Sequence, residues 1–95
     1  LQLQPAEIIT KSFRSRMSAP SGSYEVDGHV KFRLGFDFLV LIECKRHARP
    51  VERADVQVLH SKMQELSAQK GVFFSTAGFQ TGAVQFAGGK GIALV

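Results

Sequence analysis

Apolar and polar side chains alternate along residues 24–32, so the two kinds would lie on opposite faces of an extended segment. One face carries Tyr24, Val26, Val30 and Phe32, and the other carries Glu25, Asp27, His29 and Lys31. A period of two is typical of a β-strand that buries one face. We therefore predict a half-exposed strand over residues 24–32.

Residues 37–45 are apolar on both faces as far as Ile42, which is typical of a strand in the middle of a sheet. A turn near Gly35 is predicted to join them to the preceding strand, so that residues 24–45 form an antiparallel hairpin. Two shorter apolar runs, residues 72–75 and 91–95, are predicted to be further buried strands.

The first segment of the chain shows the spacing of an amphipathic helix. Pro5 suits a first helical turn, Glu7 suits the positive end, and Ile9, Phe13 and Met17 follow at intervals of four. We therefore expect a leading helix within residues 1–17.

Two later segments are also predicted to be helical. Asp55 suits the first turn of a helix that begins near residue 53, and Lys70 and Gly71 suit its end. The stripe that this helix would bury consists of Val56, Leu59, Met63 and Leu66. A shorter helix is predicted over residues 80–87.

The predicted elements follow one another in the order αββαβαβ, with helix, strand, helix and strand over residues 53–95. Right-handed crossovers then give an α/β fold in which a mixed sheet, an antiparallel hairpin joined to parallel strands, is flanked by helices. A length of 95 residues fits a single domain, residues 1–95. Because the chain begins at Leu1 without a methionine, we expect a trimmed or excised domain.

The composition is that of an ordinary globular domain with a net charge of +4. No apolar run approaches the roughly 20 residues that span a bilayer, and the lone Cys44 excludes an internal disulfide, which fits a cytoplasmic location. The positive charge is clustered, and such clusters favour a polyanionic partner or are simply solvated. One cluster is Lys11, Arg14 and Arg16, and the other is Lys45, Arg46, Arg49 and Arg53.

The end of the second strand carries the candidate chemistry. Glu43 and Lys45 share a strand face, and an odd-length loop around Gly35, or one bulge, would place Asp27 on that face too. A two-residue loop would place Asp27 on the opposite face. Two adjacent carboxylates repel unless one is protonated or a cation lies near, and Mg²⁺ prefers such oxygen ligands. The alternatives are a surface ion pair between Glu43 and Lys45, and Asp37 as a rival metal acid.

Asp27 followed by Glu43-Cys44-Lys45 resembles the active-site motif of the PD-(D/E)XK nuclease superfamily. Residues 42–46, 70–79 and 91–95 are similar to the catalytic domain of Mrr-like restriction endonucleases, so a restriction-endonuclease-like fold is implied. The resemblance implies that Asp27, Glu43 and the Cys44 main-chain carbonyl bind Mg²⁺, with Mn²⁺ as a substitute, and that Lys45 serves the attacking water. It also aligns Glu7 with a first-helix acid that reaches the metal. Two features depart from the pattern: Val26 stands where the motif has proline, and residues 18–23 lack an expected strand.

Several further residues are expected to contact DNA or support the site. The DNA-binding candidates are Arg46, His47, Arg49, Arg53 and Thr76, with Lys11 and Arg14 as additional basic contacts. Gln57 could point toward the site as a polar helper, although an exposed helical glutamine explains it as well.

Together these features predict an Mg²⁺-dependent endonuclease of the restriction type acting on double-stranded DNA. A DNA-repair or junction-resolving nuclease would share the same active-site residues, and a non-catalytic nucleic-acid-binding domain would need only the basic clusters. A homodimer and a target-recognition domain outside this chain are expected partners, because one site cuts one strand and the domain has little room for recognition.

Overall fold

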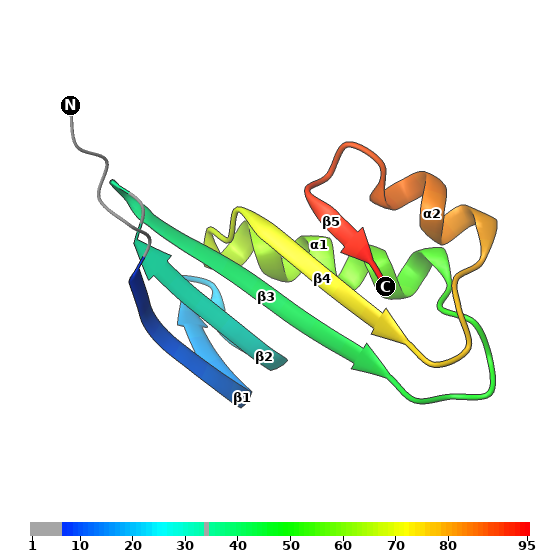
Figure 1. Ribbon diagram of the computed structural model, residues 1–95, viewed down its shortest axis with the longest axis horizontal. Helices are drawn as coiled ribbons and strands as arrows, with labels where there is room; N and C mark the ends of the chain where they lie inside the picture. Colours follow the sequence, from blue (N-terminus) through cyan, green and yellow to red (C-terminus); the bar gives the residue numbers. More distant parts are fainter. Residues whose placement is uncertain (1–6, 34) are drawn as a thin grey trace.

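The computed structural model describes residues 7–33 and 35–95, which form one mixed five-stranded sheet and two helices (Figure 1). The strands are β1 (Glu7–Ala19), β2 (Gly22–Arg33), β3 (Asp37–Lys45), β4 (Lys70–Ser75) and β5 (Ile92–Leu94). The helices are α1 (Arg53–Leu66) and α2 (Thr81–Ala87).

The strands lie in the sheet in the order in which they occur in the chain. The pairs β1–β2 and β2–β3 are antiparallel, whereas β3–β4 and β4–β5 are parallel and are connected through α1 and α2. Helix α1 packs against β3 and β4, and α2 packs against α1 and β5. The predicted α/β fold, a mixed sheet with an antiparallel hairpin joined to parallel strands and flanked by helices, is confirmed.

The leading helix expected within residues 1–17 is wrong for the part that the structure describes, because residues 7–19 form β1. An interval of four residues fits one helical turn, but it also equals two strand periods, so Phe13 and Met17 share a face in either conformation. Pairing with β2 along nearly its whole length decides for the strand. Strand β1 is also the strand that the nuclease pattern requires before the Asp27 strand and that residues 18–23 did not show in the sequence. Residues 1–6, including Pro5, lie outside the described residues.

The hairpin between β2 and β3 has the odd-length loop that the active-site hypothesis requires. Arg33 pairs with Asp37, so an odd number of positions, three, separates the last paired residues. Gly35 has φ +76°, a left-handed conformation that glycine adopts without steric cost. At the other end of the ladder Gly28 pairs with Ile42, so the next positions along the two strands, Asp27 and Glu43, face each other.

The core lies between the sheet and α1. Leu41 of β3, Val51 of the β3–α1 connection, and Val56 and Leu59 of α1 are fully buried. The predicted stripe is confirmed, since Met63 is also buried and Leu66 packs against the core. The helix ends earlier than predicted: Ser67 takes a left-handed conformation at its C-terminus, and residues 70–75 already belong to β4.

Candidate active site

The carboxyl end of β3 presents two charged side chains to α1. Leu41 is buried on the face that α1 covers, and with a period of two Glu43 and Lys45 continue on the same face. Glu43 Oε1 accepts a hydrogen bond of 2.9 Å from Lys62 Nζ, and Lys45 Nζ donates one of 2.9 Å to Asp55 Oδ2. Both partners come from α1, so the helix closes over the end of the strand.

Asp27 joins this group at the point where β2 leaves the ladder with β3. Its Oδ2 accepts a hydrogen bond of 2.7 Å from the backbone N–H of Cys44, so a side-chain oxygen satisfies a strand donor. The Asp27 carboxyl also lies close enough to Glu43 to affect the Glu43 pKa through a hydrogen bond and through its charge. The predicted meeting of Asp27 and Glu43 on one face is therefore observed.

The environment perturbs three pKa values in this region. Burial raises the pKa of Glu43 above its ordinary value, and Asp27 adds to the rise, while the ammonium of Lys62 opposes it. Burial also raises the pKa of the Cys44 thiol, with contributions from the charges of Asp27 and Glu43. Asp55 behaves differently: burial raises its pKa, but the hydrogen bonds from Lys45 and the Glu52 N–H, with the charges of Lys45 and Arg49, hold the value below its ordinary one.

A cleft of about 420 Å³ opens beside the two carboxylates. Lys62 bridges across it, because its Nζ also donates to the carbonyl oxygen of Glu25 at 2.7 Å. Arg14 lines the same cleft from β1 and has φ +52°, an uncommon conformation for a residue other than glycine. The β1–β2 register passes from Phe13–Gly28 to Ser15–Val26 without a pair at Arg14. This local distortion of β1 lies directly beside Asp27.

The donor set fits a hard divalent cation. Mg²⁺ is usually bound through one or two carboxylates, with waters and phosphate oxygens completing the octahedron. Asp27 and Glu43 supply two carboxylates, and Asp27 raises the pKa of Glu43 through a hydrogen bond and through its charge, in addition to the larger effect of burial. Residues 7–33 and 35–95 contain no group of three or more His, Cys, Asp and Glu side chains arranged to hold a metal.

Two residues that sequence reasoning assigned to the site lie elsewhere. The backbone of Glu7 pairs with Arg33, six residues along β2 from Asp27, or about 20 Å at the rise of a strand. The assignment of Glu7 depended on a leading helix, and β1 carries it to the far end of the sheet. Gln57 is exposed, because a residue two positions from Asp55 points to the opposite side of α1. The exposed-glutamine alternative therefore fits, and the helper role does not.

Asp37, the rival metal acid, also lies outside the site. It pairs with Arg33 at 3.0 Å and with Lys31 at 3.8 Å at the hairpin loop, at the opposite end of β3 from Lys45. Its contacts are those of a residue that stabilises the hairpin.

Sequence reasoning missed Asp55 and Lys62 as members of the site. They are seven residues apart on α1 and therefore share a face. Helix α1 runs antiparallel to β3. The acid Asp55, which comes first on α1, therefore meets Lys45, and Lys62, which comes later, meets Glu43. This charge pattern was the available signal, but it becomes informative only once α1 is known to pack back over β3.

The predicted DNA-binding residues surround the end of β3. Arg46, His47 and Arg49 are exposed in the β3–α1 connection. Arg46 and Thr76 line a second cleft, of about 290 Å³, together with Lys45, and the Thr76 N–H donates to the Lys45 carbonyl at 3.2 Å. Arg53 is placed differently, since its guanidinium lies over the ring of Phe86 at 5.4 Å.

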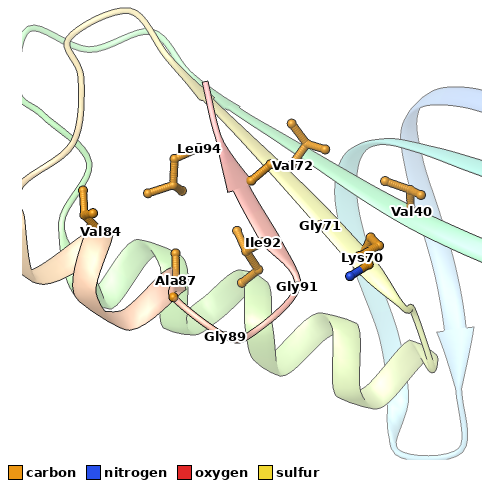
Figure 2. A pocket seen from close by; sticks show the side chains of 12 residues that line it. Val40, Lys70, Gly71, Val72, Val84, Ala87, Gly89, Gly91, Ile92 and Leu94 are labelled. Carbon is orange, nitrogen blue, oxygen red and sulfur yellow. The ribbon is translucent and has the colours of Figure 1, made fainter.

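A larger hollow elsewhere lacks the groups needed for catalysis. It has a volume of about 730 Å³ and lies between β4, β5 and α2 (Figure 2). Aliphatic side chains such as Val72, Val84 and Ile92 line it together with several glycines, and Lys70 is the charged residue among them. It holds no carboxylate among its lining residues, whereas the end of β3 brings together Asp27, Glu43 and Lys45.

The mixed sheet, with an aspartate, a glutamate and a lysine gathered at one end, defines the class of restriction-endonuclease-like domains of the PD-(D/E)XK type. A family model described as restriction endonuclease, the Mrr catalytic domain, matches residues 8–95. The chain belongs to this family and is a nuclease domain of the restriction-endonuclease type.

A solved structure has the same fold. The crystal structure of AF1548, a protein of unknown function, is 21% identical in sequence and superposes with a TM-score of 0.74. The match covers 90% of this chain and 47% of that one, so the present chain spans about half the length of that protein. At this identity the likeness shows the fold alone.

No curated protein matches the sequence. Neither helix of the described residues has the length and apolar character that a membrane crossing requires.

Proposed function

We propose that this domain is an Mg²⁺-dependent endonuclease that hydrolyses phosphodiester bonds of double-stranded DNA. The observation that carries the proposal is the meeting of Asp27 and Glu43 on the face of Lys45, in a chain that belongs to a restriction endonuclease family. Two carboxylates beside a lysine form a group suited to phosphate hydrolysis with a divalent metal, in which the protein mainly supplies fixed charges and orientation.

Asp27, Glu43 and the main-chain carbonyl of Cys44 are the proposed ligands of Mg²⁺, and Mn²⁺ is expected to substitute. When bound, the metal stabilises the negative charge that develops on the phosphate and favours ionisation of the attacking water. Asp27 is held in place by the Cys44 N–H, so one ligand is fixed to the strand that carries the other. Lys45 is proposed to donate a hydrogen bond that orients the water.

The exposed residues around the end of β3 are proposed to contact the DNA backbone. Arg46, His47, Arg49 and Thr76 lie on the two connections next to Lys45, and Arg14 approaches from β1. Contacts of this kind neutralise phosphates and position the duplex without reading its sequence. Arg53 can join them only at the edge of this surface, because its guanidinium packs on Phe86.

Cleavage assays on several forms of DNA test the proposal. Supercoiled plasmid, linear duplex, single strand and a four-way junction should be incubated with Mg²⁺, with Mn²⁺ and with EDTA. We expect metal-dependent cleavage of plasmid and linear duplex, with nicked plasmid appearing first if one site acts alone and linear plasmid directly if a homodimer acts. Preferred cleavage of the junction would favour the junction-resolving alternative. Binding of duplex without any cleavage in either metal would overturn the nuclease proposal and favour a binding domain.

A further inference from the structure

The ammonium of Lys45 is held by a residue of α1 that no motif of the sequence singles out. Lys45 Nζ donates to Asp55 Oδ2 at 2.9 Å, with the two side chains 19% and 30% exposed. A lysine side chain has four rotatable carbon–carbon bonds and does not fix its own ammonium. The position of this group therefore depends on its acceptor.

Asp55 is itself fixed by the start of the helix. The same Oδ2 accepts a hydrogen bond of 2.9 Å from the backbone N–H of Glu52, and the Glu52 side chain accepts from the N–H of Asp55 in return. This reciprocal capping box ties both residues to the first turn of α1. The next residue, Val56, is fully buried, so the turn is anchored to the core.

We propose that Asp55 is a positioning residue for Lys45. An ammonium has three N–H donors, and Asp55 takes one, which leaves the remaining two directed by the fixed nitrogen toward the water and the phosphate. The inference rests on the proposed function, because it assumes that Lys45 acts on the attacking water. It adds that the rate of DNA cleavage depends on Asp55 of α1 as well as on Lys45.

The capping box provides a matched control for this inference. Glu52→Ala and Asp55→Ala each remove one of the two reciprocal cap hydrogen bonds, but only Asp55→Ala releases Lys45. Both variants should therefore lose thermal stability, and Asp55→Ala should lose more, because it also removes the ion pair with Lys45. At a temperature where both remain folded, we expect kcat for plasmid cleavage to fall by about 10- to 100-fold in Asp55→Ala and to stay within about twofold of the parent in Glu52→Ala. KM should change little in either variant, since the duplex is held by other residues.

A double-mutant cycle with Lys45→Ala shows whether Asp55 acts through the lysine. In the Lys45→Ala background, the further change Asp55→Ala should have almost no effect on kcat. An equal fall in kcat for Glu52→Ala and Asp55→Ala, or an undiminished effect of Asp55→Ala without Lys45, would overturn the inference and reduce Asp55 to a helix cap.

Side-chain NMR of the Lys45 ammonium in the metal-free domain separates this inference from the proposed function. We expect an ordered ammonium in the parent and in Glu52→Ala, and a mobile one in Asp55→Ala. The same pattern in a domain that cleaves no DNA would remove the nuclease proposal while supporting the placement of Lys45 by Asp55. Equal mobility in all three proteins would refute the placement itself.

Discussion

Two ion pairs of the same length join β3 to α1, but the pKa values of their two acids are shifted in opposite directions. Lys62–Glu43 and Lys45–Asp55 are both 2.9 Å long. Nevertheless the pKa of Glu43 is raised and that of Asp55 is lowered. Glu43 is the more buried acid and faces the second carboxylate of Asp27, whereas Asp55 receives a backbone hydrogen bond and lies near Arg49.

The two pairs differ in the charges that surround them. In the Lys45–Asp55 pair one positive charge meets one negative charge, whereas the Lys62–Glu43 pair also faces the carboxylate of Asp27. Asp55 and Lys45 satisfy each other, so their pair can serve as a rigid fixture. Glu43 and Asp27 together carry more negative charge than Lys62 balances, and such an excess favours either a bound proton or an added cation. The Lys62–Glu43 pair therefore lies where the proposed metal would relieve the repulsion, and the Lys45–Asp55 pair lies where the proposed role of Lys45 needs a fixed ammonium.

Removing the carboxylate of Asp27 or Glu43 should have the largest effect on DNA cleavage. Asp27→Ala and Glu43→Ala are each expected to abolish Mg²⁺-dependent plasmid cleavage, because neither variant retains both proposed metal ligands. Binding to a short duplex, measured by fluorescence anisotropy, should be unchanged or slightly tighter, since a negative charge near the phosphate is lost. Asp37→Ala is the matched control and should remain active. A folded but inactive Asp37→Ala beside an active Asp27→Ala would transfer the metal role to Asp37.

Removing Lys45, the lysine paired with Asp55, should affect turnover but not metal binding. Lys45→Ala is expected to lower kcat by about 10²- to 10⁴-fold, because the water loses the group that orients it. Titration with Mn²⁺ should give a dissociation constant close to that of the parent domain. A large loss of Mn²⁺ affinity would show that Lys45 supports the metal ligands instead.

Removing Lys62, the lysine paired with Glu43, should lower the stability of the metal-free domain, and Mg²⁺ should offset this loss. Lys62→Met leaves Glu43 without its ammonium and is expected to destabilise the metal-free domain by about 1–3 kcal/mol, measured by urea unfolding. Because Mg²⁺ would then supply the missing charge, it should raise the melting temperature more in this variant than in the parent. Lys11→Met, a change at an exposed residue of β1, is the control. Equal Mg²⁺ shifts in all three proteins would contradict a cation site beside Glu43.

The pH dependence of stability should show the two acids acting in opposite directions. Glu43 has a folded pKa above 4.5, so the folded state binds its proton more tightly and metal-free stability should decrease as the pH rises through that folded pKa. Asp55 has a folded pKa below 3.8, so its contribution is present above about that pH and is lost as the pH falls through the folded pKa. Glu43→Gln should remove the first slope and Asp55→Asn the second, in urea unfolding measured across this range. Unchanged slopes in both variants would show that other groups control the pH dependence.

The sequence alone determined the parts of the fold in which one period is unambiguous. Alternation in residues 24–32 and the stripe of Val56, Leu59 and Met63 each fit only one kind of element, so β2 and α1 were predicted correctly. The acid and lysine at the end of β3 were also found from the sequence, because their shared face follows from the period of a strand.

Only the tertiary structure decided the remaining features. The interval of four between Phe13 and Met17 suits a helix and a strand equally, and pairing with β2 selected the strand. The position of Asp27 relative to Glu43 depended on whether the hairpin loop had an odd or even number of residues, which local sequence left open. Asp55 and Lys62 joined the site because α1 folds back antiparallel over β3, and long-range packing of this kind leaves no local periodic signal in the chain.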